Sequence, residues 1–164
     1  MKKSIILLLA TLLLFSVAGC NKNEVADPKS EVELLVGYMV IEGDTLRFDE
    51  VEIVKMEDKE RMQELDLKDS DMVNTYVIIN ENQEETTFDL ADEVEYIFTD
   101  INLNFIKESE GDRIYHTTEK DEFLKHLDEY NLNDIPLSEQ TIPYFIKVQD
   151  GKVISIEERI EYTI

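Results

Sequence analysis

Short blocks of apolar residues, separated by polar turns, follow one another along most of the chain and predict a domain built mainly from strands. Residues 35–41 form a continuous apolar run that is short enough for a buried strand. Residues 42–44 (Glu-Gly-Asp) turn the chain, and apolar and polar residues then alternate over 45–54 with a slip near Asp49-Glu50. We therefore expect a second strand there, with a β-bulge at the slip.

The middle of the chain adds a short helix and further strands. Residues 58–65 are predicted to form the helix, with Asp58 as its N-cap and with Met62 and Leu65 facing inward. Strands are predicted over residues 74–80, 86–90 and 94–99, and a short one over 103–106. Each of these elements is followed by polar residues, so turns are expected between all of them.

A second helix is predicted after residue 117. Thr118 and Asp121 resemble a capping box in which Asp stands in place of the usual Glu. The apolar face that follows has helical spacing and consists of Phe123, Leu124, Leu127 and Tyr130. Asn131 and Pro136 are expected to end the helix. His126 lies at the margin of the apolar face, which is typical of a partly exposed helix histidine.

The chain is predicted to end in a hairpin. Residues 143–149 and 152–164 flank Asp150-Gly151, which favours a type I′ turn. Apolar residues then recur with period two at Ile154, Ile156, Ile160, Tyr162 and Ile164. This pattern places one face of the last strand inside the protein and leaves the face with Ser155 exposed to water.

Six or seven short strands and two helices predict an α+β fold, in which an antiparallel sheet carries two short helices. A curved sheet or a small partly open barrel would each protect the edge strands, and the sequence leaves open which of the two forms. No second linker and no internal repeat follow residue 32. Residues 32–164 are therefore predicted to form a single acidic α+β domain.

The start of the chain has the pattern of an export signal. A cationic start precedes an apolar stretch over residues 5–18, which is shorter than the roughly 20 residues that a helix needs to cross a bilayer. At its end, Val17-Ala18-Gly19-Cys20 resembles a bacterial lipobox. The resemblance implies that residues 1–19 are a lipoprotein signal peptide, cleaved between Gly19 and Cys20, and that the Cys20 sulfur carries a diacylglyceryl group.

Residues 20–31 are then predicted to be the lipidated cysteine and a flexible tether, which would hold the domain at the outer face of a bacterial cell membrane. Two acyl chains suffice for stable anchoring. With one cysteine, an intramolecular disulfide and a multi-cysteine zinc site are excluded. The 38 acids and 16 bases give a net charge of −22, and −24 without the signal peptide, which excludes nucleic acid and repels anionic headgroups. Contact with the membrane is therefore expected through the lipid.

Motifs of catalytic or metal sites are absent from the sequence. There is no HExxH and no GxSxG, and the two histidines, His116 and His126, have no spaced partner. Two acidic clusters lie in predicted loops, and they consist of Asp66, Asp69 and Asp71 and of Glu81, Glu84 and Glu85. Neither has the spacing or the glycine of a calcium loop. No catalytic residue, metal site or cofactor is therefore expected.

Three segments of the chain resemble a family of uncharacterised small secreted proteins and lipoproteins of Gram-positive bacteria. The first is Gly37-Tyr38, and the second is residues 74–80 (Asn-Thr-Tyr-Val-Ile-Ile-Asn). The third is the ending, which consists of Pro-Tyr-Phe-Ile-Lys-Val from residue 143, the turn residue Gly151, and Val-Ile-Ser-Ile-Glu-Glu from residue 153. The chain departs from the family at Thr75, where glycine is preferred. These motifs are structural, so the resemblance implies a fold and a location, and it supplies no catalytic or binding residue.

Together these features predict a membrane-anchored extracytoplasmic lipoprotein that is not an enzyme. Its expected role is to bind an envelope protein, a peptide or a small ligand. Two alternatives remain open at this point. One is an envelope hydrolase that uses a carboxylate or histidine site, and the other is a calcium-responsive module that uses the acidic loops.

Overall fold

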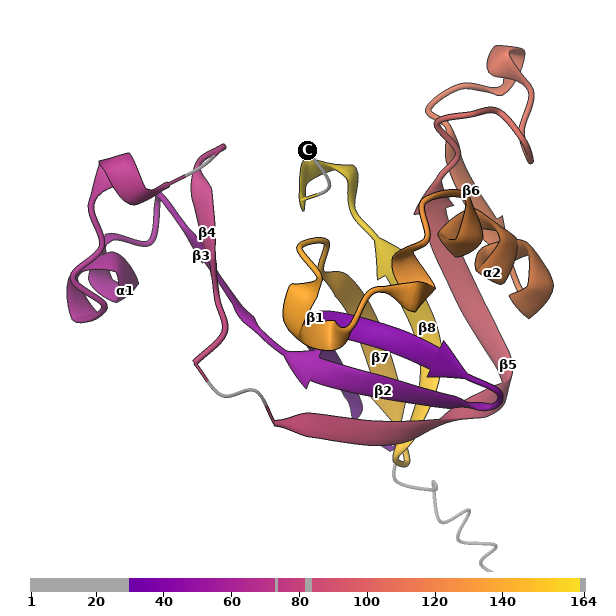
Figure 1. The fold of residues 1–164 in the computed structure, drawn as a ribbon, viewed down its shortest axis with the longest axis horizontal. Helices are drawn as coiled ribbons and strands as arrows, with labels where there is room; N and C mark the ends of the chain where they lie inside the picture. The colour runs from indigo at the N-terminus through magenta and orange to yellow at the C-terminus, as the bar shows by residue number, and fades with distance from the viewer. Residues whose placement is uncertain (1–29, 73, 82–83, 163–164) are drawn as a thin grey trace, which may run out of the picture.

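Five strands close into a small barrel in the computed structural model, which describes residues 30–72, 74–81 and 84–162 (Figure 1). The barrel strands are β1 (Val32–Glu42), β2 (Thr45–Glu50), β5 (Glu85–Thr99), β7 (Tyr144–Gln149) and β8 (Lys152–Glu158). They pair in the ring order β1-β2-β5-β8-β7, and β7 pairs back onto β1. Because the ring is closed, each barrel strand has a neighbour on both sides, and this protects the strand edges.

The α+β class is confirmed, but the prediction of a purely antiparallel sheet is wrong. β5 and β8 run parallel, from the pair Asp89–Lys152 to the pair Ile97–Glu157. Between them the chain passes through β6 (Ile114–Thr117), α2 (Lys120–Glu129) and β7, so β8 returns alongside β5 in the same direction. A parallel pair needs such a crossover connection. The period-two pattern of a strand does not show whether its neighbour in the sheet runs parallel or antiparallel to it.

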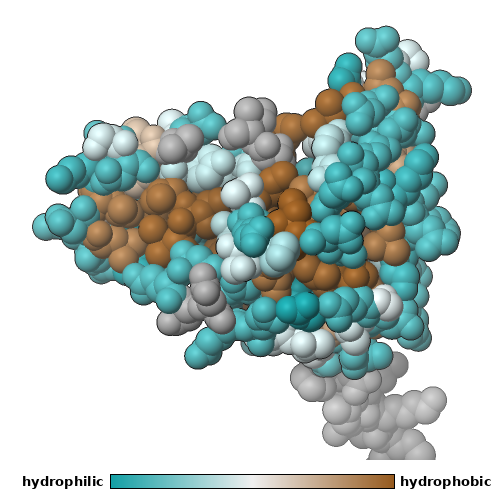
Figure 2. Space-filling view, viewed as in Figure 1, coloured by the Kyte–Doolittle hydropathy of each residue, from teal (hydrophilic) through white to brown (hydrophobic). Residues whose placement is uncertain are grey.

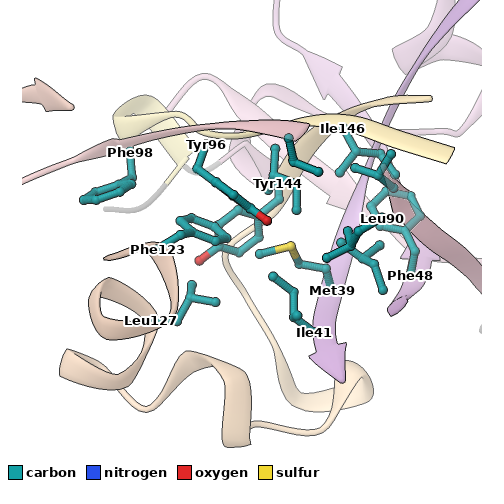
Figure 3. Close-up of a cluster of buried hydrophobic side chains, with 14 of the residues drawn as sticks. Met39, Ile41, Phe48, Leu90, Tyr96, Phe98, Phe123, Leu127, Tyr144 and Ile146 are labelled. Atoms are coloured by element: carbon teal, nitrogen blue, oxygen red, sulfur yellow. The ribbon is translucent and has the colours of Figure 1, made fainter. Parts of the chain in front are cut away.

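Apolar side chains fill the interior of the barrel. The buried members of this core are Met39, Ile41, Leu46, Phe48, Leu90, Val94, Tyr96, Phe98, Phe123, Leu127, Tyr144, Ile146, Val148, Val153 and Ile156. Helix α2 covers one end of the barrel, where Phe123 stacks on Tyr96 with ring centroids 4.9 Å apart and meets Tyr144 edge-on (Figure 3). Each fully buried large side chain contributes about 1.5–3 kcal/mol, so this core is the main source of stability.

Gly37 marks the place where β1 changes partners. It pairs with Tyr144 of β7 on one side and with Glu50 of β2 on the other. A Cβ atom at this position would lie 2.3 Å from the Asp49 carbonyl oxygen and 2.7 Å from the Phe48 ring. Such distances are far inside van der Waals contact, so the close approach of β1 and β2 requires glycine here. This gives the Gly-Tyr pair of the sequence a structural reason.

An arm, defined here as residues 52–79, leaves the barrel between β2 and β5 (Figure 1). It consists of β3 (Glu52–Lys55), α1 (Lys59–Glu64) and β4 (Tyr76–Ile79), with β3 and β4 paired antiparallel. The predicted helix is confirmed together with its cap, because the Asp58 carboxylate accepts a hydrogen bond from the Arg61 N–H at 3.1 Å. A second small core of Tyr38, Val51 and Leu137 lies where the arm meets the barrel. The ring of Tyr76 also contacts Tyr162, with centroids 4.9 Å apart.

The sequence predicted a β-bulge at the slip in the pattern at Asp49-Glu50, and this prediction is wrong. β2 ends at Glu50, and β3 begins two residues later in a different sheet. Val51 still donates its backbone N–H to the Val36 carbonyl oxygen at 2.9 Å, after which the chain turns away from β1. The phase change therefore marks the exit of the chain from the barrel into the arm. A bulge and an exit look alike in one sequence, because both shift the alternation by one residue.

The two strands predicted over 86–90 and 94–99 are halves of one strand. β5 spans 15 residues, and its register with β8 shifts between Leu90 and Glu95. Four residues of β5 (91–94) stand there opposite Ile154 of β8, so β5 bulges away from the ladder. The polar residues in the bulge had suggested a turn between two strands.

The strand predicted over 103–106 is wrong. In that segment Leu103 has a φ of 58°, in the left-handed region, and the chain folds around the carboxylate of Asp100. The side chain accepts the backbone N–H groups of Asn104, Phe105 and Ile106, at distances of 2.8–2.9 Å. A carboxylate that satisfies three N–H groups replaces the ladder that a strand would need. The strand β6, which the sequence did not predict, follows this loop.

The predicted start of helix α2 is wrong. The N-cap is Glu119, and its side chain makes no capping hydrogen bond. Thr118 and Asp121 do not form the expected capping box. Instead, the Thr117 hydroxyl accepts the Glu119 N–H at 3.0 Å and donates to the Glu122 carboxylate at 2.6 Å. The predicted helix end is confirmed: the residue after the last turn, Asn131, has a φ of 54°.

The C-terminal hairpin is confirmed, and its turn has φ values of 52° at Asp150 and 76° at Gly151, as a type I′ turn requires. The second strand is shorter than predicted, because β8 ends at Glu158 and a 3-10 turn follows at Ile160–Tyr162. The strict alternation is also wrong. The buried residues of β8 are Val153, Ser155 and Ile156, and Ile160 is 40% exposed. Register shifts against both β7 and β5 break the period at this point.

Candidate functional site

His126 and Glu158 form a buried histidine–carboxylate pair that joins helix α2 to the end of β8. His126 Nε2 lies 2.9 Å from Glu158 Oε2, and the side chains are 3% and 8% exposed. The prediction of a partly exposed His126 is therefore wrong. Helix α2 turns Phe123, His126 and Leu127 toward the barrel, so the buried face is wider than the spacing of its apolar residues suggested.

The surroundings of the pair are aromatic on one side and polar on the other. The His126 ring stacks on Phe98 with centroids 4.2 Å apart. Glu158 Oε2 also accepts the backbone N–H of Thr99 at 3.3 Å. The Tyr144 hydroxyl is buried without a hydrogen-bond partner, and burial together with the negative charge of Glu158 raises the pKa of Tyr144 well above its usual value. These groups form a buried polar cluster beside the apolar core.

A catalytic role needs a base that a substrate can touch. Neither of the two cavities described below is lined by His126 or Glu158. The second histidine, His116 on β6, is 57% exposed and lies 3.3 Å from the half-exposed carboxylate of Glu95. The structure thus places the two histidines in two separate pairs, one buried inside the fold and one on an open surface.

Asp100 is a second buried acid, 2% exposed, and it interacts electrostatically with His126. Burial raises the pKa of the Asp100 carboxyl. The three backbone N–H groups of the loop that it caps, helped by His126, outweigh that effect and hold the pKa below its usual value of 3.8. This carboxylate fixes the loop after β5 in place.

Three members of the predicted acidic clusters are held in separate contacts. Asp69 pairs with Lys59 at 2.9 Å, Asp71 accepts the Lys68 N–H at 2.8 Å, and Glu85 pairs with Arg47 at 2.6 Å. Within residues 30–72, 74–81 and 84–162, no three His, Cys, Asp or Glu side chains gather in a group that could hold a metal ion.

Glu81 and Glu84 meet two other glutamates at an opening between the barrel and the arm, called here the arm-base cavity. It measures about 340 Å³ and is lined by Glu50, Val51, Glu52, Ile79, Glu81, Glu84 and Thr86. Arg61 binds Glu52 through two hydrogen bonds, of 2.7 and 2.8 Å. The remaining glutamates give the cavity a negative rim, which favours a cationic group.

A second opening, called here the bulge cavity, lies where the β5 bulge faces the β1–β2 turn and the start of α2. It measures about 380 Å³, and its lining includes Asp44, Leu90, Asp92, Val94, Tyr96 and Lys120. Lys120 links the start of α2 to the β1–β2 turn beside this cavity, because its Nζ donates to Asp44 Oδ1 at 2.7 Å and to the Gly43 carbonyl oxygen at 3.1 Å. Sequence analysis did not predict this cavity, because its residues come from three distant segments.

Apolar side chains gather on the arm side of the molecule, framed by polar ones, on the face shown in Figure 2. The half-buried apolar residues of the arm include Ile53, Met56, Leu65, Leu67, Val77, Ile78 and Ile79. Strand β4 pairs only with β3 among the described residues, so its second edge is open. An open strand edge beside apolar side chains is a common place for a partner to dock.

Asp49 and Asn80 connect the barrel to the base of the arm. Asn80 Nδ2 donates to Asp49 Oδ2 at 2.8 Å, and Asp49 is 2% exposed. The other oxygen of each side chain, Oδ1 in both, is buried without a hydrogen-bond partner. Buried oxygens without a donor destabilise a fold. The sequence indicated neither the pair nor its burial, because Asp49 is the acid at which the pattern slips.

Gly19 and Cys20, the predicted cleavage and lipidation positions, lie outside the described residues. Over the part of the chain that is described, no helix combines the length and the apolar character needed to span a membrane. No protein-family model, no curated protein and no solved structure matches the chain. The lipobox and the family resemblance stay predictions.

Proposed function

We propose that this protein is an extracytoplasmic lipoprotein, anchored through Cys20, whose folded domain is a non-catalytic binding module for a basic protein partner. The observation that carries the proposal is the arm, which leaves the closed barrel and presents an open strand edge beside partly exposed apolar side chains. Surfaces of this kind in soluble domains are typical of interaction sites.

Charge favours a basic partner. Residues 52–79 carry eight acids and four bases, and three more glutamates, Glu50, Glu81 and Glu84, stand at the arm base. With a net charge of −22, the chain attracts cationic surfaces over a distance of several ångströms. The acids therefore speed the approach of a basic partner, and the apolar residues supply the burial that holds it.

The position of the first described residues fits an anchor at one end of the barrel. Val32 pairs with Gln149 beside the β7–β8 turn, and the Ser30 hydroxyl accepts a hydrogen bond from the Gln149 amide at 2.6 Å. A tether that ends there would hold this turn nearest the membrane. The β1–β2 turn lies at the other end of the 11-residue strand β1, about 33 Å further along it at the usual rise of a strand.

The anchor is tested by labelling cells with radioactive palmitate. The wild-type chain should take up label and lose its first 19 residues, whereas Cys20→Ala should remain unlabelled. Ser16→Ala, which changes the same leader and leaves the thiol, is the matched control and should label like the wild type. Equal labelling of the wild type and Cys20→Ala would overturn the anchor.

The binding surface is tested by photo-crosslinking in the cell with the full chain. A photoreactive amino acid at Val77 on the arm should give an adduct that the same group at Lys152, on the barrel, does not give. The double change Glu81→Lys and Glu84→Lys should suppress the adduct, whereas Glu31→Lys and Glu33→Lys, exposed acids elsewhere, should leave it. An adduct that is indifferent to both double changes would contradict a basic partner.

A further inference from the structure

The bulge cavity exists because β5 and β8 are not paired along this stretch. Their register moves from Leu90–Val153 to Glu95–Ser155, so the bulge residues between Leu90 and Glu95 are released from the β8 ladder. The start of α2 and the β1–β2 turn lie opposite, held together by the Lys120–Asp44 contact. The space between them measures about 380 Å³, within the range of cavities that bind small molecules.

Tyr96 is the buried polar group that faces this space. Its side chain lines the cavity and is 2% exposed, and its ring is fixed by stacking on Phe123. Figure 3 shows the hydroxyl directed away from Phe98. Among the hydrogen bonds of the described residues, none involves this hydroxyl. Burial, and after it the charge of Asp44, raises the pKa of Tyr96 to about 12, so the phenol stays neutral at physiological pH.

The hydrogen-bonding groups left free around the cavity are mainly acceptors. Lys120 is already bound to Asp44 and to a backbone carbonyl oxygen, so the Asp44 carboxylate largely balances its charge. The second oxygen of Asp44, the exposed carboxylate of Asp92 and the oxygen of Tyr96 remain as acceptors, and the Thr118 hydroxyl at the rim can accept or donate. An ammonium group has three donors and no acceptor, which matches three such oxygens.

We propose that the bulge cavity is a binding site for a small primary amine, whose ammonium group is held by Asp92, Asp44 and the Tyr96 hydroxyl while its short apolar body contacts Leu90 and Val94. The strongly negative charge of the chain raises the local concentration of such cations. The site is separate from the arm, and it depends neither on the proposed protein partner nor on the lipid anchor.

The test is a titration of the purified, ¹⁵N-labelled full chain in a non-ionic detergent with n-butylammonium chloride at constant ionic strength. Backbone amide shifts should saturate and should concentrate at residues 90–96, Asp44 and Lys120. 1-Butanol, which has the same apolar body, should bind about tenfold more weakly or worse, because it lacks the charge. Sodium butyrate should give no saturable shifts at these residues.

Three variants separate this site from general attraction of cations to an acidic protein. Asp92→Asn and Tyr96→Phe should each weaken n-butylammonium binding by about five- to tenfold, and Tyr96→Phe keeps the ring that stacks on Phe123. Asp89→Asn, an exposed acid of the same strand outside the cavity, should leave the affinity unchanged. Shifts that do not saturate, or an equal response of Asp89→Asn and Asp92→Asn, would overturn the proposal and leave a cavity that holds only water.

Discussion

The imidazole of His126 and the carboxylate of Glu158 meet at 2.9 Å inside the fold, with side chains that are 3% and 8% exposed. The contact connects the helix that covers the barrel to the last residue of the last barrel strand. A partner removed from such a pair leaves a polar or charged group that has no water to compensate it. The same residue types meet at the surface in His116 and Glu95, which provides a natural control.

Removal of the buried imidazole should therefore be costly. His126→Ala is expected to lower the free energy of unfolding by about 3–5 kcal/mol, because it takes the imidazole away from the buried Glu158 carboxylate and removes the ring that stacks on Phe98. His116→Ala should change it by no more than about 0.5 kcal/mol. Urea denaturation of the two variants measures both values. Similar losses would show that burial of the pair does not matter.

The stability of the loop after β5 should depend on acid pH through Asp100. The pKa of Asp100 is lowered in the folded protein. Its contribution to stability is therefore complete above the ordinary value of 3.8 and is lost as the pH falls through the lower folded value. Asp100→Asn should therefore be less stable than the wild type at neutral pH, and the difference should shrink below about pH 4. Thermal unfolding from pH 7 to pH 2 measures it. A difference that stays constant over this range would contradict the assignment.

The pair Asp49–Asn80 predicts a stabilising substitution. Asp49→Asn keeps the shape of the side chain and the acceptor for the Asn80 amide, and it replaces a buried carboxylate oxygen that has no hydrogen-bond partner with an amide group. Its melting temperature should equal or exceed that of the wild type. Asp49→Ala should lose about 1–3 kcal/mol, because it leaves the Asn80 amide without its acceptor. If both variants lose the same stability, the Asp49 carboxylate has a role that an amide cannot fill.

Gly37 should not tolerate a side chain. Gly37→Ala places a Cβ 2.3 Å from the Asp49 carbonyl oxygen and 2.7 Å from the Phe48 ring, so β1 and β2 must separate. We expect a loss of about 1–3 kcal/mol or more, as for other overpacked sites. Gly43→Ala has free space around its Cβ and only the strain of a φ of 60°, so it should cost less. Circular dichroism melts of both variants give the comparison, and a milder effect at Gly37 would count against a tight β1–β2 contact.

The sequence by itself determined the turns and helix ends that depend on a few neighbouring residues. The Asp150-Gly151 turn, the Asp58 cap and the end of α2 at Asn131 follow from the backbone preferences of a few neighbouring residues, and the structure has all three. The α+β class follows from the alternation of apolar and polar residues. The predictions of an export leader and of a lipid on Cys20 also rest on local signals, which concern how the cell processes the chain.

Tertiary structure decided the closure of the barrel, its parallel β5–β8 pair and every group of residues with possible chemistry. His126 is buried because Glu158, 32 residues later, meets it, and the bulge cavity gathers Asp44, Tyr96 and Lys120 from three segments. From the sequence, the slip at Asp49 predicts a bulge, whereas in the structure it marks the place where the arm leaves the barrel. The local pattern of apolar and polar residues indicates which side of an element a side chain is on. Whether that side chain is buried, and what it pairs with, depends on distant segments of the chain that pack against that side. The local pattern does not contain this information.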